Sequence, residues 1–322
     1  MWMYLAVASP PSQRFVVVWR SVMISKPARL RREHFSLAIE QDKTAFVPFE
    51  DIAVLVLNHR EITLTHPVLS ACAEYGIGLY CTGDNHQPSG ILLPFLAHSR
   101  ATRMQRLQME LARPAAKQAW SVIVKQKINN QATCLKQCGH DAHEQLESYA
   151  RRVRSGDIGN LEAQASAVYF RKLFGADFQR AQERWINAAL DYGYAVMRGA
   201  VARGLVAHGL LPSIGLFHSS EQNAFNLADD VIEPFRPIVD LHVASRPGAR
   251  GKETGESELS PTDKAALVSL LNVDVSMTRG RMTVLSAIEH FVESLVRIYE
   301  GSGSTVLELP QLIGLKQHVH EH

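Results

Sequence analysis

The pattern of apolar and polar positions divides the chain into two parts. Up to about Gly90, short apolar runs rich in β-branched residues alternate with turn residues, as in 52–57. Beyond Phe95, apolar residues recur at intervals of three and four over long segments, as in 184–208. The first pattern is typical of strands and the second of amphipathic helices. The sequence therefore predicts an α+β protein, with a small N-terminal β-rich domain followed by a larger all-helical domain.

Individual elements can be placed from the same pattern. We expect one helix, 67–75, among strands at 22–24, 44–48, 52–57 and 76–81, with turns at 83–85 and 88–90. In the second part we expect helices at 104–111, 116–128, 184–208 and 282–299.

These elements suggest boundaries between the parts of the chain. We assign residues 18–95 to the β-rich domain and 96–322 to the helical domain. Residues 244–264 are rich in Gly, Ser, Pro and alternating charge, so we expect a mobile loop there. Residues 1–17 precede the recognisable pattern, and we interpret them as an extension that arises from the chosen start codon.

Three side chains of metal-binding type lie in segments that suit a metal site. Glu162 falls in the first turn of an expected helix capped by Asn160, where the helix dipole favours an ionised carboxylate. His218 follows a glycine-containing turn, and Glu233 lies three residues after Asp230, on the same expected helix face. Glu162, His218 and Glu233 could together hold one divalent cation. Asp230 is then either a fourth ligand or the partner of a ligand.

The ligand types indicate which ion would bind. Two carboxylates and one imidazole favour Mg²⁺ or Mn²⁺, whereas cysteine or a second histidine would favour zinc. Such an ion acts on phosphate groups. Pro234 is expected to distort the turn at Glu233, because it lacks a backbone donor and disfavours helical geometry at the residue before it. Taken singly, each ligand also has an ordinary structural explanation, as a capping acid, a core histidine or a solvated helix face.

Four blocks of the sequence resemble the signature motifs of the CRISPR-associated spacer integrases, the "Cas one" family. The blocks are Glu162-Ala-x-Ala-x-x-x-Tyr169-Phe170, Asn187-Ala-Ala-Leu-Asp-Tyr192-Gly-Tyr194, Gly209-Leu-Leu-Pro212-x-x-Gly215-Leu-Phe-His218 and Asp230-Val-Ile-Glu233-Pro-Phe-Arg236-Pro237. The resemblance runs from about Trp19 to near the C-terminus. Within the family, the run 223–230 and the proline after Glu233 are similar to the branch found in type II systems.

The resemblance implies an activity and a ligand set. The helical domain would be catalytic, with Glu162, His218 and Glu233 as the ligands of Mg²⁺ or Mn²⁺. Its reaction would insert short foreign DNA into a CRISPR array, as the 3′-hydroxyl of the incoming DNA attacks a phosphodiester at the repeat boundary. With water as the nucleophile, the same site would act as an endonuclease. Such a protein acts in CRISPR adaptation, which is part of an antiviral defence.

The same motifs place two tyrosines and an arginine near the ion. Tyr169 and Tyr192 could contact substrate, but core packing with a satisfied hydroxyl is the ordinary role of such residues. Arg236 could hold a phosphate through two hydrogen bonds, or could pair with Asp240 or Glu233.

The resemblance also implies partners. These are double-stranded DNA, both protospacer and CRISPR repeat, and a second copy of the chain paired through the β-rich domain. A small companion adaptation protein of the "Cas two" family would bridge two such dimers. Other type II CRISPR proteins are further candidate partners.

The charge of the chain limits how it could bind DNA. Thirty-four basic residues nearly balance 32 acidic ones, giving a formal net charge of +2, so DNA binding would depend on local patches. We select Arg103, Lys125, Lys127 and Arg152 as candidates, since they lie on expected helices or just before the Glu162 motif. For any single residue of this set, a solvated helix face is the alternative.

Four cysteines in a chain of this length do not indicate a disulfide framework, so we expect a reduced, cytoplasmic protein. Cys72 and Cys81 are expected to pack as small apolar residues. The spacing of Cys134, Cys138, His140 and His143 allows a zinc site, but we favour a helix ending at Gly139 and a polar connection. No apolar run reaches the length of a membrane span.

Two other functions stay open at this point. One is a stand-alone hydrolytic nuclease that acts on branched DNA, which would not need a donor 3′-hydroxyl. The other is a non-catalytic architectural DNA-binding subunit, in which the acidic and histidine residues are structural.

Overall fold

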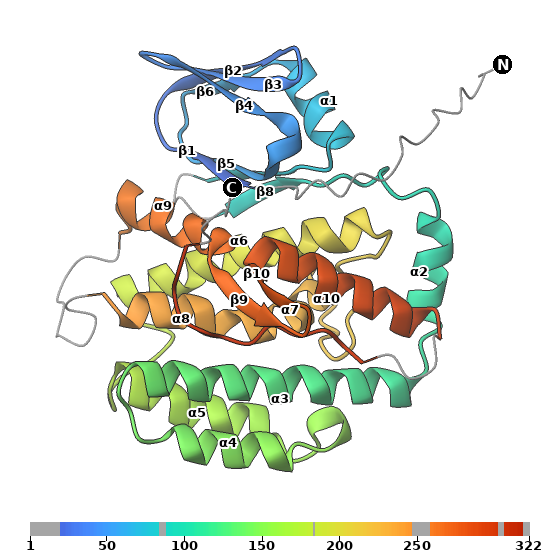
Figure 1. The fold of residues 1–322 in the computed structure, drawn as a ribbon, viewed down its shortest axis with the longest axis vertical. Coiled ribbons are helices and arrows are strands. Elements are labelled where there is room, and N and C mark those ends of the chain that lie inside the picture. The colour runs from blue at the N-terminus through green and yellow to red at the C-terminus, as the bar shows by residue number, and fades with distance from the viewer. Residues whose placement is uncertain (1–19, 84–87, 183, 247–257, 302–305, 318–322) are drawn as a thin grey trace.

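Strand β5 (Ile52–Leu57) is the centre of the N-terminal sheet, and all six of its apolar residues are buried. It lies between β1 (Arg20–Ile24) and β7 (Gly78–Thr82) and runs parallel to both. Strand β8 (Pro88–Leu92) closes the sheet by pairing antiparallel to β7. A continuous apolar strand suits a parallel sheet that is covered on both faces. This computed structural model describes residues 20–83, 88–182, 184–246, 258–301 and 306–317 (Figure 1).

A second sheet completes the β-rich unit and, with α1 beside it, lies at the end of the molecule away from the helical domain (Figure 1). Its strand order is β4-β3-β2-β6. The bounds are β2 Ala28–Glu33, β3 Ser36–Glu40, β4 Thr44–Pro48 and β6 Ile62–Leu64, with η1 Phe49–Asp51 and α1 His66–Glu74 in the same unit.

Helices dominate the rest of the described chain. Their bounds are α2 Ala101–Met109, α3 Arg113–Gln137, α4 His143–Arg152, η2 Ser155–Asp157, α5 Leu161–Phe174, α6 Trp185–Ala207, α7 Asn226–Ile232, η3 Glu233–Phe235, α8 Arg236–Ala244, α9 Pro261–Ser269, η4 Leu270–Asn272 and α10 Val284–Tyr299. A hairpin of β9 (Asp274–Met277) and β10 (Gly280–Thr283) lies among them.

Helix α3 lies between two layers of this helical domain. It packs against α4 and α5 on one side and against α7, η3 and α8 on the other (Figure 1). One face of α3 is therefore in reach of side chains from both layers. This arrangement brings together residues that are far apart in the sequence.

Helix α6 connects the helical domain to the β-rich unit. It is buried along most of its length and contacts β7, β8, α7, α8, α9 and α10. Gly199 faces Tyr80 of β7, and a Cβ on Gly199 would lie only 2.2 Å from the Tyr80 ring. Glycine at this position therefore allows helix and sheet to approach closely.

The predicted fold class is confirmed, with an addition. A β-rich unit precedes a helical domain, but the second part is not all-helical because it contains the β9–β10 hairpin. The expected helix at 282–299 begins at Val284, since Met282 belongs to β10. The expected turn at 88–90 is wrong, because these residues pair with β7 as part of β8. The predicted domain boundary at 95 and 96 falls between β8 and α2.

The predicted mobile loop and one cysteine also need correction. Residues 261–264 of the loop form the start of α9, and 247–257 lie outside the described residues, as do residues 1–17. The side chain of Cys72 is buried as expected, whereas Cys81 is exposed on β7. In the described part of the chain, no helix has the length and apolar character needed to span a membrane.

Candidate metal centre

Asp157 fixes the start of the helix that carries Glu162. Its two carboxylate oxygens accept hydrogen bonds from the backbone N–H groups of Leu161 and Glu162, at 3.0 and 2.9 Å. We predicted that Asn160 would cap this helix. Asn160 does occupy the N-cap position, but its side chain makes no capping hydrogen bond. Asp157, in the preceding 3₁₀ turn η2, instead accepts hydrogen bonds from two N–H groups in the first turn of α5.

The buried carboxylate of Asp230 organises the segment that carries His218. It accepts hydrogen bonds from the backbone N–H groups of Leu216, Phe217 and His218, at 2.6, 3.0 and 3.2 Å. It also lies 2.6 Å from His218 Nδ1. A Cβ at Gly215 would lie 2.3 Å from the His218 carbonyl oxygen and 2.8 Å from Asp230, so the turn requires glycine. Asp230 is therefore the partner of His218, one of the two roles predicted for it.

Glu233 occupies the short 3₁₀ turn between α7 and α8. The predicted change of helix geometry at Pro234 is confirmed, since two α-helices meet here through η3. The predicted departure of Glu233 from helical angles is wrong, because its φ and ψ are −50° and −46°. The Pro234 carbonyl oxygen accepts a hydrogen bond from Asn130 Nδ2 at 2.7 Å. This contact ties the turn to α3.

Lys127 of α3 brings two of the predicted metal ligands to one point. Its ammonium group pairs with Glu162 Oε1 and lies 2.5 Å from Glu233 Oε2. The Lys127 side chain is 9% exposed. Ser166 adds a hydrogen bond to Glu162 Oε1 at 3.3 Å. Lys127 was predicted to lie on a DNA-binding surface. This prediction is wrong, because the side chain is buried between two carboxylates.

Neighbouring cations keep Glu233 ionised. Burial raises the pKa of this carboxyl group, but Arg236 and Lys127 outweigh burial and lower its pKa to about 2. Burial lowers the pKa of Lys127, but Glu233 and Glu162 together raise it above the ordinary value. Arg236 Nε donates to Glu233 Oε1 at 3.0 Å, one of the roles predicted for this arginine.

These residues carry the types of donor atom that a hard divalent cation prefers. Glu162 and Glu233 already converge on a cationic group, and buried Glu233 Oε2 accepts no well-aligned hydrogen bond from any described residue. Because His218 contacts Asp230 through Nδ1, Nε2 is the ring nitrogen left for another ligand. The described residues nevertheless contain no group of three or more His, Cys, Asp or Glu side chains close enough to hold an ion. The structure thus brings Glu162 and Glu233 together and leaves His218 outside that pair.

The two predicted tyrosines, Tyr169 and Tyr192, are buried. Tyr169 donates to Asp240 Oδ2 at 2.9 Å, and Tyr194 donates to Asp240 Oδ1. Burial raises the pKa of Asp240 to about 6, even though both tyrosines act against it. Tyr192 is fully buried. All three rings therefore belong to the core. Core packing with a satisfied hydroxyl, the alternative that we considered, describes Tyr169, whereas the buried Tyr192 hydroxyl has no hydrogen-bond partner among the described residues.

The remaining basic candidates lie on several helices. Arg103 of α2 pairs with Glu300 at 2.9 Å. Lys125 of α3 is half-buried, and Arg152 of α4 is exposed with its guanidinium over the Tyr149 ring at 4.9 Å. Arg103, Lys125 and Arg152 stay predictions as DNA contacts.

The cysteine and histidine cluster lies around the end of α3. Cys134 is buried, α3 ends at Gln137, and Gly139 has a positive φ of 76°. The helix end that we favoured at Gly139 is therefore confirmed. His143 Nδ1 lies 3.1 Å from the His140 carbonyl oxygen.

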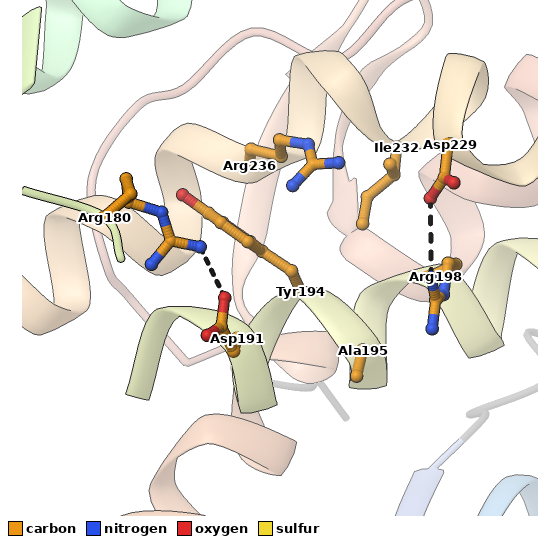
Figure 2. Close-up of a pocket in the computed structure, with 8 residues that line it drawn as sticks. All are labelled: Arg180, Asp191, Tyr194, Ala195, Arg198, Asp229, Ile232 and Arg236. Atoms are coloured by element: carbon orange, nitrogen blue, oxygen red, sulfur yellow. Dashed lines mark hydrogen bonds and ion pairs between the residues drawn. The ribbon is translucent and has the colours of Figure 1, made fainter. Parts of the chain in front are cut away.

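Arg236 also lines a pocket of about 360 Å³ (Figure 2). Arg180, Asp191, Tyr194 and Arg198 line the same pocket. No sequence pattern singled out Arg180 or Arg198, because each lies far along the chain from Arg236. The packing of α6 against α7 and α8 brings Arg198 to Arg236, and Arg180 comes from the connection between α5 and α6.

Comparison with known proteins shows which family this chain belongs to. A sequence model described as "CRISPR associated protein Cas1" matches residues 22–247. A CRISPR-associated endonuclease Cas1 of Neisseria meningitidis serogroup C (strain 8013) is 41% identical over 309 residues, covering 95% of this chain and 100% of that protein. This chain therefore belongs to the Cas1 family of CRISPR-associated proteins.

Solved structures share the fold. A casposase bound to integration product superposes with a TM-score of 0.71 at 19% identity, covering 88% of this chain and 92% of that chain. A partial Cas6-RT-Cas1–Cas2 complex gives 0.62 at 15% identity, with 92% and 100% covered.

Proposed function

We propose that this protein is a divalent-metal-dependent DNA strand transferase and endonuclease of CRISPR adaptation. The observation that carries the proposal is the convergence of Glu162 and Glu233 on the ammonium group of Lys127. Two carboxylates around one cation, together with an imidazole that contacts Asp230, have the donor types of a metal site that acts on phosphodiesters. Membership of the Cas1 family supports the same reaction class, as does the fold shared with a casposase bound to its integration product.

Mg²⁺ or Mn²⁺ is the proposed cofactor, with Glu162, His218 and Glu233 as its ligands. When bound, the ion would supply charge stabilisation for a phosphodiester under attack by a DNA 3′-hydroxyl. Asp230 would accept a hydrogen bond from Nδ1–H of His218, which leaves Nε2 to bind the ion. Arg236 keeps Glu233 ionised and in place.

We further propose the partners of the reaction. These are double-stranded DNA, a second copy of this chain, and a small companion protein of the Cas2 type. Solved Cas6-RT-Cas1–Cas2 complexes contain this fold, which supports the companion. Other type II CRISPR proteins as partners, and a cytoplasmic location, stay predictions.

Strand transfer with a blocked donor tests the proposal. A short duplex donor should become covalently joined to a supercoiled plasmid carrying a repeat, in Mg²⁺ or Mn²⁺ and with the companion protein present. The joined product should vanish when the donor ends in a dideoxy nucleotide, because the nucleophile is then missing. Glu162→Ala and His218→Ala should abolish joining while gel shifts show DNA binding retained.

The rival functions give different results in the same assay. Plasmid nicking at equal rates with normal and blocked donors, without joined product, would identify a hydrolytic nuclease. DNA binding without any metal-dependent cleavage or joining would identify an architectural subunit. Full activity of Glu162→Ala or His218→Ala would remove that residue from the site.

A further inference from the structure

Two prolines reduce the backbone hydrogen bonding of the turn that carries Glu233. Proline has no N–H group, so Pro234 and Pro237 each remove one donor where α7, η3 and α8 meet. An α-helix joins the carbonyl of each residue to the N–H four residues later, so the Glu233 carbonyl cannot make that bond with Pro237. The position of the Glu233 carboxylate therefore depends on contacts from outside the turn.

The side chain of Asn130 supplies such a contact from α3. Asn130 is 2% exposed, and its Nδ2 donates to the carbonyl oxygens of Pro234 at 2.7 Å and Pro310 at 2.9 Å. Its Oδ1 accepts from the Leu312 backbone N–H at 3.1 Å and from Gln126 Nε2 at 2.9 Å. Both amide hydrogens and both oxygen lone pairs are thus used, which is the full capacity of the side chain. A fully satisfied buried amide holds its partners in one arrangement.

The hydrogen bonds of Asn130 join three distant parts of the sequence. The proline turn is 104 positions away, and the carbonyl that it reaches in segment 310–312 is 180 positions away. Asn130 also follows Lys127 by three residues on α3, so the two side chains share one face of the helix. Lys127 contacts the carboxylate of Glu233, and Asn130 holds the backbone of the next residue. One helix face therefore acts on both the charge and the position of this ligand.

The contact from α3 to the other carboxylate is longer. Gln131 Nε2 lies 3.5 Å from Ser166 Oγ, and Ser166 donates to Glu162 Oε1 at 3.3 Å. Gln131 is 2% exposed, and its Oε1 accepts no hydrogen bond from the described residues. The short, fully paired contacts therefore lie on the side of Glu233.

We propose that Asn130 is a positioning residue of the metal centre, and that segment 310–312 is the second anchor through which it holds Glu233 in place. This role rests on the proposed function and goes beyond it, because Asn130 acts through Glu233 and not on the ion. The anchored turn keeps the Glu233 carboxylate beside that of Glu162. Loss of the anchor lowers metal affinity without removing a ligand.

The Mn²⁺ affinity of the DNA-free protein tests this role. Asn130→Leu keeps the number of side-chain heavy atoms, removes the four hydrogen bonds and leaves both carboxylates. Electron paramagnetic resonance of free Mn²⁺ measures the binding that Glu162→Ala abolishes. Asn130→Leu should weaken this binding by about 10- to 100-fold, the usual cost of losing a group that holds a metal ligand. In the joining assay, the Mg²⁺ concentration that gives half the maximal rate should rise, with a smaller effect on the rate at saturating Mg²⁺.

Asn187→Leu is the matched control. Asn187 of α6 is 4% exposed, and its Nδ2 donates to the carbonyl oxygens of Gln179 and Gln182 at 2.9 and 2.7 Å. It thus holds a connection between helices as Asn130 does, but its hydrogen bonds reach neither Glu162 nor Glu233. Both substitutions should lower the melting temperature, because each leaves buried backbone groups unpaired. Only Asn130→Leu should lower the Mn²⁺ affinity.

Hydrogen exchange of the wild-type protein tests the anchor without a substitution. The Leu312 N–H donates to Asn130, so Mn²⁺ binding should slow its exchange several-fold if segment 310–312 and Glu233 are held together. The Thr65 N–H, which donates to the Leu30 carbonyl at 3.1 Å in the β-rich unit, should exchange at the same rate with and without Mn²⁺.

Three results would overturn the proposed role. Asn130→Leu could bind Mn²⁺ as tightly as the wild type, or Asn187→Leu could lose as much affinity as Asn130→Leu. The third is an exchange rate at Leu312 that Mn²⁺ leaves unchanged. Failure of the proposed function differs, because the wild type would then show no Mn²⁺ binding that depends on Glu162 and no metal-dependent joining, and both proposals would fall.

Discussion

At the residue scale, Glu233 has the most constrained environment of the predicted ligands. Its carboxylate is buried between Lys127 and Arg236, whereas the Glu162 side chain is 28% exposed. Removing the carboxylate would leave two buried cations with less countercharge, which destabilises proteins. For Glu233 the structure predicts a loss of stability in addition to loss of activity.

The depressed pKa of Glu233 gives a pH-dependent prediction. A folded-state pKa of about 2, against an ordinary value of 4.5, stabilises the fold above pH 4.5, and that stability is lost as the pH falls toward 2. The contribution is about 3 kcal/mol. Urea unfolding of wild-type and Glu233→Gln proteins at pH 7 and pH 3 should show a difference that shrinks at the lower pH. An equal difference at both pH values would contradict it.

The identity of the candidate ligands, but not their electrostatic setting, could be predicted from residues. Glu162, His218, Glu233 and Asp230 follow from ligand type and motif. The contacts of Lys127 with Glu162 and Glu233 span 35 and 106 positions of the sequence. Local patterns carry no information on such pairs, so Lys127 was interpreted as a surface cation.

At the element scale, the turn before α5 determines where Glu162 points. Asp157 and Asn160 both have left-handed backbone angles, with φ of 47° and 48°, and the three residues between capping carboxylate and helix form a compact turn. Glycine tolerates both backbone angles, so the same substitution at the two positions separates the cap from the backbone conformation.

We expect Asp157→Gly to reduce the free energy of unfolding by about 1–2 kcal/mol, since two N–H groups of the first turn lose their acceptor. Asn160→Gly, the matched control, should change it by only a few tenths of a kcal/mol, because its side chain makes no cap. Urea denaturation followed by circular dichroism measures both. Equal losses would show that the turn conformation, and not the carboxylate, stabilises α5.

Long elements with a regular period could be predicted, and short polar ones could not. The period of 184–208 identified α6 to within one residue at each end. Strand β2 reads Ala-Arg-Leu-Arg-Arg-Glu, and its charged residues hide a strand that the neighbouring β3 and β6 stabilise by pairing. The β9–β10 hairpin is four residues per strand and pairs only with itself, apart from isolated bridges among described residues. The strands that the sequence pattern missed are therefore stabilised by pairing with other strands and not by their local sequence.

At the scale of the whole molecule, the contact between α6 and the β-rich unit depends on the size of the side chain at position 199. We expect Gly199→Ala to destabilise the protein by about 1–3 kcal/mol, because its methyl group would overlap the Tyr80 ring. Helix propensity alone would predict the opposite sign. Thermal melts can compare Gly199→Ala in the wild-type background and in Tyr80→Ala, where the space is open. A loss that persists without the Tyr80 ring would argue against a steric origin.

The position of Lys127 has a consequence for the order in which ligands arrive. The Lys127 ammonium group offsets negative charge on Glu162 and Glu233. A polyanion that approaches this region therefore does not meet two uncompensated negative charges, and its encounter need not wait for metal loading. In the proposed reaction this internal counterion would let DNA bind before the metal ion, which must displace the ammonium group from the two carboxylates.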